Sequence, residues 1–560
     1  MRATTLCVAL SVAACHGNIG AELVTPPAPR VTPAPSATPT ASPTPSPTAP
    51  PVDPPKPFEP GPPVVRRVVG AHYVATIGTL LGPEAAALAI APPDAALNGL
   101  DAIGAAQLAL DTSAVRAYES SARAVAAAAI AHGALARWAQ CRSMDDACYG
   151  TFVSRFARAL FRRPLEADEI TAWVAVAHDA RVATMDFDTG LLHLIAGLLQ
   201  APSFLYRPEL GADDPAHPGW KKLTPHELAT RLAFFLTERG PDDALLTAAD
   251  RGELETPAAI ATHVDRLLAT PEAQGALASY YDELLQLRDL PTASKNAALF
   301  PELDDALRNS MREETQRFIA DIVWTENTDF RRIFDANYTF MDTRLATLYG
   351  VDRGLGRGFT KVTLPPATKR GGIFGQASFH TLHSHATTTS PTLRGKFVRE
   401  VLMCQPIRPP PPGVVTVLPV DPPSTPRTTR QRLEDAHFTN EGCRGCHANM
   451  DGIGFGLENF DPIGKFRLTE NNLPIDARTA LDGAAFEGAA ELGALIAPMR
   501  GTMVCAARGL YRQAVGRVET ENEEAAITAI VGGFEASGWR MQKLLAEIVL
   551  SDGFRYVKAE

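Results

Sequence analysis

The chain has 560 residues, of which 45% are hydrophobic and 21% charged, as in globular proteins. At this length we expect several domains, or a large helical body of modules packed in series, rather than a single core. The formal net charge of -10 argues against binding to phosphate backbones, so we expect no nucleic-acid partner.

Residues 1–14 are predicted to be an export signal of the lipoprotein type. Arg2 precedes a short apolar run from Leu6 to Ala14, which is far shorter than the roughly 20 apolar residues that span a bilayer. The run ends in Val12-Ala13-Ala14-Cys15, which looks like a bacterial lipobox with Cys15 as the lipidated residue. The alternative is an ordinary secretory signal followed by an incidental cysteine. We therefore expect an exported protein of the cell envelope, in the periplasm or at the outer membrane, that meets the membrane through its N-terminal lipid only.

Residues 15–63 are predicted to be a disordered linker rich in Pro, Thr and Ser. The run Ser42-Pro43-Thr44-Pro45-Ser46-Pro47 is typical of it, and such a segment cannot bury a core. It prefers extended polyproline geometry, so we expect a stalk that separates the folded body from its lipid anchor.

After the stalk the apolar spacing predicts an all-α fold of several helical modules. Phe152, Phe156 and Leu160 recur every four residues, and Thr-Pro pairs that typically open helices occur at residues 224, 256 and 270. The charged run from Arg312 to Glu314 is interpreted as a solvated helix face. The predicted modules are a degenerate N-terminal one at 64–135, helical ones at 136–210 and 215–352, a His/Gly-rich one with a C-x-x-C-H motif at 365–470, and a C-terminal helical one at 475–560.

The C-x-x-C-H motif consists of Cys443, Cys446 and His447, and it is the attachment pattern of a covalent haem c. Two thiols bind the two vinyl groups of one porphyrin, and the adjoining imidazole is the proximal iron ligand. Two other interpretations remain open. Cys443 and Cys446 could form a disulfide clasp in an oxidising compartment, or a zinc ion could bind there with the help of His437.

The distal iron ligand is not given by the motif itself. Met499 and Met503 follow at a separation similar to that of the methionine ligand in small cytochromes, and methionine would raise the reduction potential. His383 and His385, in a glycine-rich stretch with His380, are the other candidates, and an unfilled position is the third outcome.

The remaining cysteines of the exported part are predicted to form disulfides. Sequence proximity favours a bond between Cys141 and Cys148, which leaves Cys404 and Cys505 to pair with each other. The acidic continuation of the motif could be a calcium loop, but we expect Glu458 and Asp461 to pair with Arg467 or Arg394 instead.

Several stretches of the chain carry a resemblance to one family: Phe161-Arg162-Arg163-Pro164-Leu165, Ser203-Phe204-Leu205-Tyr206-Arg207, Leu345-Ala346-Thr347-Leu348-Tyr349-Gly350, Thr389-Ser390-Pro391-Thr392-Leu393-Arg394-Gly395 and the run from Asp451 to Arg467. The chain resembles large exported, cytochrome-c-like proteins of planctomycetes and myxobacteria, built from consecutive domains of unknown function in the fifteen-eighty-five to fifteen-ninety-five series. The resemblance covers nearly everything after Arg66 and implies an exported location and a haem, but no established reaction. It departs from the family pattern at Thr237, where tryptophan is usual, and at Gly452, where proline is usual.

From these observations we expect a lipid-anchored c-type haem protein that exchanges electrons with a redox partner protein outside the cytoplasm. Two alternatives are kept. One is a non-haem scaffold or binding protein with a Cys443–Cys446 clasp, and the other is a haem enzyme with an open iron site.

Overall fold

The computed structural model describes residues 56–141, 144–351, 358–409, 422, 424–439 and 441–559. The predicted signal peptide, the lipidation site at Cys15 and residues 15–55 of the linker lie outside this part. Within the described ranges no helix is both long enough and apolar enough to cross a bilayer.

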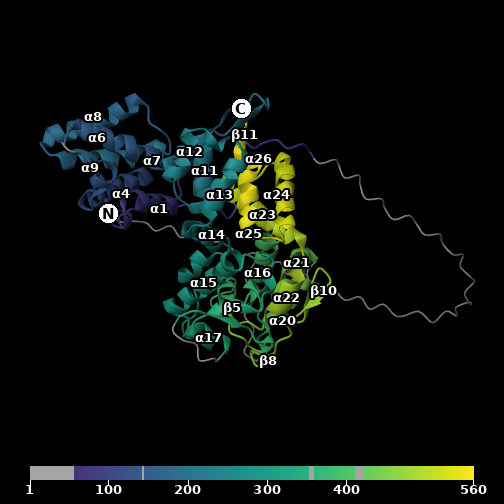
Figure 1. Cartoon of the computed structure of the whole chain (residues 1–560). Helices are drawn as coiled ribbons and strands as arrows, with labels where there is room; N and C mark the ends of the chain where they lie inside the picture. Colours follow the sequence, from purple (N-terminus) through teal and green to yellow (C-terminus); the bar gives the residue numbers. More distant parts are fainter. Residues whose placement is uncertain are drawn as a thin grey trace, which may run out of the picture. The chain divides into compact units, whose positions relative to one another are not determined.

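The all-α fold with several helical modules is confirmed, and the sheets are small antiparallel pairs or triplets (Figure 1). The first half of the chain contains β1 (Val64–Arg67), α1 (Gly70–Leu81), α2 (Pro83–Ala86), α3 (Asp101–Gln107), α4 (Thr112–Ala131), α5 (Ala134–Trp138), α6 (Asp146–Phe152), η1 (Val153–Ala157), α7 (Arg158–Phe161), α8 (Ala167–Thr184), α9 (Phe187–Leu198), α10 (Pro202–Leu205), β2 (Tyr206–Glu209), β3 (Ala212–Asp213), β4 (Trp220–Lys222), α11 (Pro225–Thr237), α12 (Asp243–Asp250), η2 (Glu253–Glu255), α13 (Pro257–Leu268) and α14 (Pro271–Leu284).

The second half continues the helical pattern up to the last residues. Its elements are η3 (Leu287–Thr292), α15 (Asp305–Ala320), η4 (Asp321–Thr325), α16 (Arg332–Asp335), β5 (Tyr338–Met341), α17 (Thr343–Tyr349), β6 (Thr360–Thr363), η5 (Pro366–Thr368), η6 (Ile373–Gly375), α18 (Ala377–Leu382), α19 (Pro391–Phe397), η7 (Val398–Leu402), α20 (Thr429–Leu433), η8 (Glu434–Phe438), α21 (Glu441–Phe455), β7 (Thr469–Glu470), β8 (Leu473–Pro474), β9 (Thr479–Leu481), β10 (Ala484–Phe486), α22 (Ala489–Ile496), α23 (Arg500–Val515), η9 (Glu521–Glu523), α24 (Glu524–Ala536), α25 (Met541–Leu550), α26 (Asp552–Arg555) and β11 (Tyr556–Lys558).

The three Thr-Pro helix starts are confirmed. Thr224, Thr256 and Thr270 are the N-caps of α11, α13 and α14, and each hydroxyl accepts a hydrogen bond from the backbone N–H three residues on. These caps satisfy helix-end donors that would otherwise lack a partner, and the proline after each threonine needs none.

Two hydrophobic clusters organise the described residues. One joins α1, α4, α6 and α9 through side chains such as Tyr73, Tyr118 and Phe152. The other joins Leu100 and Ile103, at α3, to buried residues between Leu223 and Val557, so the later modules share one core. Figure 1 shows the yellow C-terminal helices α23 and α25 beside α11 and α13, and these pairs are in contact.

Short strands connect segments that are distant in the sequence. Strand β1 pairs with β2, with Arg66 opposite Arg207, and β11 pairs with β4. The first predicted module therefore opens with a strand, because Val64–Arg67 gains its backbone partners from β2. The first pairing fixes the N-terminal strand to the second module, and the second pairing fixes the C-terminal strand to the third.

The charged run on α15 is only partly a solvated face. Glu313 is half-buried and pairs at the surface with Arg317, whose side chain is exposed, as expected for a solvated face. The prediction was wrong for Glu314, which is fully buried and accepts hydrogen bonds from Thr339 Oγ1 at 2.7 Å and Tyr349 Oη at 2.6 Å. Tertiary partners from β5 and α17 thus bring a carboxyl group into the core.

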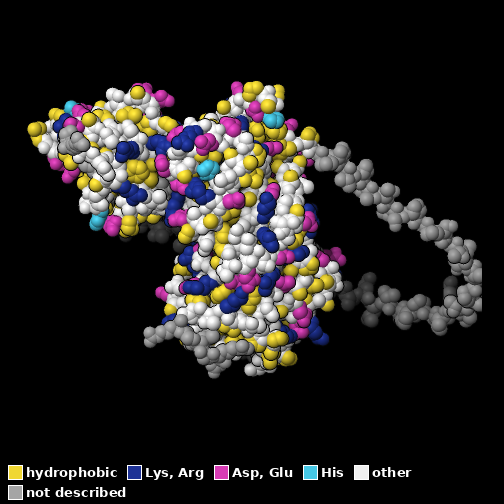
Figure 2. Space-filling view, viewed as in Figure 1, with side chains coloured by type: hydrophobic (Ala, Val, Ile, Leu, Met, Phe, Trp, Pro, Cys, Tyr) yellow, Lys and Arg dark blue, Asp and Glu magenta, His cyan; other side chains and the backbone are white. Residues whose placement is uncertain are grey.

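Elsewhere the surface is a mixture of both charges. Figure 2 shows Lys and Arg side chains interspersed with Asp and Glu on the visible face. Many of these groups form surface ion pairs, for example Arg123 with Glu119 and Arg332 with Glu326.

Candidate haem-binding site

Helix α21 carries the three residues of the C-x-x-C-H motif. Positions 443, 446 and 447 are three and four residues apart, so their side chains lie on neighbouring parts of one helix face. Cys443 and Cys446 are both free and half-buried. They do not form the clasp in this structure, although four other cysteines are bonded.

Both predicted disulfides are present. Cys141 bonds to Cys148 beside α6, and Cys404 bonds to Cys505 across a sequence separation of 101 residues. The second bond joins the segment after η7 to α23. Among the cysteines that the structure describes, only the two motif thiols are therefore left available.

The imidazole of His447 is oriented by a buried carboxylate. Its Nδ1 lies 2.9 Å from Oδ2 of Asp451, one helical turn further on, and Asp451 is fully buried. The other carboxylate oxygen, Oδ1, accepts a hydrogen bond from Thr392 Oγ1 at 2.8 Å. A carboxylate partner favours the proton on Nδ1, which leaves the Nε2 lone pair for a metal.

A second histidine lies beside this pair. The ring centroid of His437, from η8, is 3.7 Å from that of His447, and its Nδ1 is 3.8 Å from Asp451 Oδ2. Burial and the neighbouring His447 lower the pKa of His437. In the part of the chain that is described, His437, His447 and Asp451 form the one group of potential metal ligands within 4.8 Å of one another.

This geometry bears on the zinc interpretation. A structural zinc site takes four ligands, usually with thiolates among them. The group that the structure brings together holds three donors, and neither Cys443 nor Cys446 belongs to it. The donor set therefore favours haem attachment over a structural zinc ion.

The backbone around the motif is held by a tight helix crossing. A Cβ built on Gly454 of α21 would lie 2.1 Å from the carbonyl oxygen of Pro391 in α19. One built on Gly395 of α19 would lie 1.7 Å from the carbonyl oxygen of Met450. Only glycine fits at these two positions, so α19 and α21 pack backbone against backbone.

The four distal-ligand candidates lie in different surroundings. Met503 is fully buried in the larger core, and Met499 is the N-cap of α23 and packs against the same core. His383 is buried, and its ring centroid lies 5.0 Å from that of Phe379 and 4.1 Å from that of Phe397. His385 is exposed.

The electrostatics of the two candidate histidines also differ from those of a surface imidazole. Burial and the nearby Arg394 lower the pKa of His383 to about 3, so this ring is neutral at any physiological pH. Burial and Lys295 lower the pKa of His385 as well. Neither histidine belongs to the His437–His447–Asp451 group, so the distal ligand stays a prediction.

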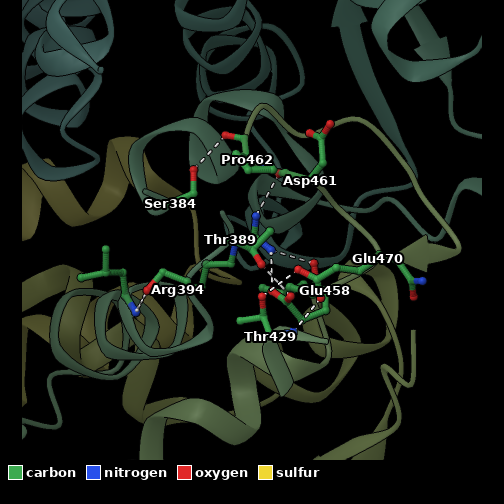
Figure 3. Close-up of polar contacts among 12 residues, drawn as sticks. Ser384, Thr389, Arg394, Thr429, Glu458, Asp461, Pro462 and Glu470 are labelled. Carbon is green, nitrogen blue, oxygen red and sulfur yellow. Dashed lines mark hydrogen bonds and ion pairs between the residues drawn. The ribbon is translucent and has the colours of Figure 1, made fainter. Parts of the chain in front are cut away.

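The acidic loop after α21 is fixed by buried arginine contacts (Figure 3). Arg394 is fully buried and donates to the carbonyl oxygen of Leu457 at 2.9 Å and to Glu458 Oε1 at 3.3 Å. Glu458 also pairs with Arg467 and accepts from Thr389 Oγ1 at 2.6 Å. The predicted pairing of Glu458 is thus confirmed with both arginines.

The prediction for Asp461 was wrong. Its carboxylate accepts backbone N–H bonds from Ile463 and Lys465, both at 2.9 Å, and Arg394 reaches only its carbonyl oxygen, at 3.0 Å. Aspartate commonly bonds in this way to its own following turn. Because Glu458 and Asp461 are engaged by the protein itself, the loop is not arranged as an open calcium cage.

Glu470 connects this loop to the segment that carries His437. Its carboxylate accepts from the backbone N–H and the hydroxyl of Thr429, both at 2.7 Å, at the start of α20 (Figure 3). Helix α20 continues directly into η8, so Glu470 helps to hold His437 beside α21.

Sequence reasoning missed Asp451 and Thr392 as parts of the site. A carboxylate four residues after the motif histidine is a visible signal for the first. The contact with Thr392 depends on the crossing of α19 and α21, which no local sequence pattern predicts.

The residues present fit a covalently attached haem. Two free thiols at the required spacing, and an imidazole whose Nδ1 is bound to a buried carboxylate, lie together on one helix. No competing disulfide or complete four-ligand metal set occupies these side chains in the described ranges.

Four family models match the chain in succession, and each is described as a protein of unknown function. They are DUF1595 at residues 148–209, DUF1592 at 223–351, DUF1588, named PSCyt3, at 370–470, and DUF1585 at 482–554. Together they cover about two thirds of the chain, and the C-x-x-C-H motif falls in the DUF1588 match. Comparison with curated proteins and with solved structures gives no match. The chain therefore belongs to the cytochrome-c-like family defined by these four modules of unknown function.

Proposed function

We propose that this chain is an exported, lipid-anchored c-type haem protein that passes electrons to or from a redox partner protein. The observation that carries the proposal is the pair of free thiols on α21, followed by a histidine whose Nδ1 is held by buried Asp451. The family match adds the association of the DUF1588 module with cytochromes.

The roles of the individual residues follow from their chemistry. Cys443 and Cys446 would each add an S–H bond across one vinyl group, which forms a C–S bond without any oxidant. His447 would bind the iron through Nε2, and Asp451 keeps the proton on Nδ1 and fixes the ring. A bound haem supplies one-electron chemistry. The half-buried thiols keep the attachment point near the surface, where a partner protein can approach.

The lipid anchor is the part of the proposal that concerns localisation. It rests on the Val12-Ala13-Ala14-Cys15 pattern. We expect the full chain to fractionate with membranes and the Cys15→Ser variant to appear in the soluble extracytoplasmic fraction. Equal distribution of the two proteins would contradict the anchor.

The test of haem attachment is expression of the full chain in a host that has a haem-maturation system. We expect the wild-type protein to keep its Soret absorption after denaturation, because its haem is covalently bound. The Cys443→Ala/Cys446→Ala variant should show no such absorption. A purified wild-type protein without covalent haem would refute the proposal. A low-spin six-coordinate spectrum would favour electron transfer, whereas a high-spin spectrum would favour the haem enzyme.

A further inference from the structure

A large cavity lies away from the residues of the haem-binding module. Its volume is about 960 Å³, at the upper end of the range of small-molecule pockets. Its walls come from α1, α5, η1, α7, α11, the start of α12, the end of α13 and the start of α14, and Figure 1 shows α7 next to α12. None of its lining residues belongs to the DUF1588 match.

The charges that line this cavity do not balance. Every carboxylate in the wall has an arginine partner, so none is left to repel an anion; the pairs are Asp242 with Arg266, Asp243 with Arg158, and Glu272 with Arg239. Two further lining arginines have no carboxylate partner among the described residues. Arg137 donates to the carbonyl oxygen of Thr79 and lies over the Trp138 ring, and Arg155 makes no polar contact there. The wall therefore has a positive excess.

Two buried polar atoms of the wall also lack partners within the described part of the chain. They are the hydroxyl of Thr76, which is only 2% exposed, and Nε of Arg239. Buried polar groups in native proteins are nearly always hydrogen-bonded. Both atoms are hydrogen-bond donors without an acceptor, which agrees with the positive excess of the wall.

The remaining wall is apolar. Leu80, Trp138, Leu246 and Leu267 line it, and the indole N–H is already used by the carbonyl oxygen of Leu80 at 3.0 Å. The ring face and the leucines offer a surface for a carbon skeleton but no further polar contact. One side of the ligand should therefore be a ring or chain, and the other should carry charge.

We propose that this cavity binds an organic anion. Its carboxylate or phosphate meets the guanidinium groups of Arg155 and Arg137, which suit either group as planar bidentate donors. Its carbon skeleton lies on Trp138 and the leucines. The site is independent of the motif cysteines and of haem.

The test uses three ligands with the same hexose skeleton: glucuronate, glucose 6-phosphate and neutral glucose. Saturation-transfer NMR and thermal shift are measured on the full chain. We expect saturable binding of at least one anion and at least tenfold weaker binding of glucose. Binding of glucuronate alone identifies a carboxylate ligand, and binding of glucose 6-phosphate alone identifies a phosphorylated one. No saturable binding of either anion, or equal binding of glucose, would overturn the proposal.

The variant Arg155→Ala tests whether the anion binds in this cavity. Arg155 is exposed and makes no ion pair with a described residue, so its removal should leave the fold intact. We expect at least a tenfold loss of affinity for the anion. The control is Arg123→Ala, which removes an exposed arginine of α4 outside the cavity. Unchanged binding in Arg155→Ala, or an equal loss in both variants, would also overturn the proposal.

Discussion

Asp451 gives the histidine of the motif its orientation, and this role has a measurable consequence. Its carboxylate makes the Nδ1–H of His447 a strong donor and so raises the basicity of Nε2, which stabilises oxidised iron. We expect Asp451→Asn to raise the reduction potential of the haem-loaded protein by some tens of millivolts, where about 60 mV corresponds to a tenfold change in a one-electron equilibrium.

The measurement is a potentiometric titration of purified protein with its haem content checked. Asn449→Ala serves as the matched control, because Asn449 is exposed on the same helix and its amide bonds only to the carbonyl oxygen of Gly445. Fully loaded Asp451→Asn protein with an unchanged potential would show that the carboxylate does not tune the ligand.

Glu314 predicts a pH dependence of stability. Burial raises its pKa to about 7, despite hydrogen bonds from Tyr349 and Thr339. This pKa lies above that of a glutamate in the unfolded chain. The contribution of Glu314 to the free energy of unfolding is therefore complete below about pH 4.5 and is lost as the pH rises through 7. We expect the free energy of unfolding to fall by up to about 3 kcal/mol between pH 5 and 8 from this group.

The variant Glu314→Gln should flatten this dependence, because a neutral amide does not ionise. The control is Glu313→Gln at the neighbouring position, since Glu313 is half-buried at the surface and its one ion pair among the described residues is with Arg317. Burial also raises the pKa of Glu283 to about 7, so part of the slope remains in both variants. Denaturant unfolding at pH 5 and pH 8 measures the difference, and identical slopes in the two variants would refute the assignment.

The motif, Glu314 and Asp461 show what a local sequence pattern can and cannot predict. The cysteine and histidine positions of the site follow from spacing alone, because covalent chemistry dictates it. Glu314 stands in a charged run, and only its contacts with Thr339 and Tyr349 reveal that it is buried. Asp461 was misassigned for the opposite reason, since its partners are the N–H groups of its own turn and no arginine is needed.

At the level of elements, the crossing of α19 and α21 is the feature that places the motif. A Cβ at Gly454 would collide with the backbone of α19, whereas one at Gly445 would meet no atom within 4 Å. We expect Gly454→Ala to lower the free energy of unfolding by about 1–3 kcal/mol through overpacking. Gly445→Ala should be neutral or stabilising by up to about 1 kcal/mol, because alanine favours helix.

The two glycine variants differ only in position on one helix, so the comparison isolates the crossing. Unfolding is followed by circular dichroism in denaturant. Equal stability of the two alanine variants would mean that α21 can move away from α19 without cost, and the proposed placement of His447 by that contact would fail.

The two disulfides should differ in what they contribute. The chain-entropy model assigns roughly 2–3 kcal/mol to the Cys141–Cys148 loop and roughly 4–5 kcal/mol to the Cys404–Cys505 loop, given sequence separations of 7 and 101 residues. We therefore expect the Cys404→Ala/Cys505→Ala variant to be the less stable of the two double variants, as measured by urea unfolding. The reverse order would indicate that the segment after η7 stays docked on α23 without its bond.

The elements themselves were predicted to different degrees. Helices α11, α13 and α14 begin where their Thr-Pro caps stand, because a cap acts within one turn. The strand pairs β1–β2 and β4–β11 were not predicted, since each short strand is stable only through a partner far away in the sequence.

On the scale of the whole molecule, a buried ionic cluster connects the two ends of the described chain. Glu209 is fully buried between Arg66 and Arg231. Arg66 also donates to the carbonyl oxygen of Ala514 at 3.0 Å, and Arg231 to that of Phe554 at 2.6 Å. One carboxylate thus holds two arginines that bind the C-terminal module, and Arg207, close by over the Phe234 ring, adds a third buried positive charge.

This arrangement makes Glu209 sensitive to acid. Burial alone would raise its pKa, but Arg231 and Arg66 bring it down to about 2. Because this value lies below that of an unfolded glutamate, the stabilisation is present above about pH 4.5 and is lost as the pH falls toward 2.

We expect Glu209→Gln to lower the free energy of unfolding by about 3–5 kcal/mol, because it leaves buried arginines without their carboxylate. Calorimetry should show the N-terminal and C-terminal modules melting together in the wild type. The Glu209→Gln variant should melt at a clearly lower temperature, and its melting temperature should depend less on pH between 4.5 and 2. Glu119→Gln, which breaks only the exposed pair with Arg123, is the control and should melt like the wild type. If Glu209→Gln melts like Glu119→Gln, the cluster does not hold the modules together, and the strand pairing and other contacts between them must do so.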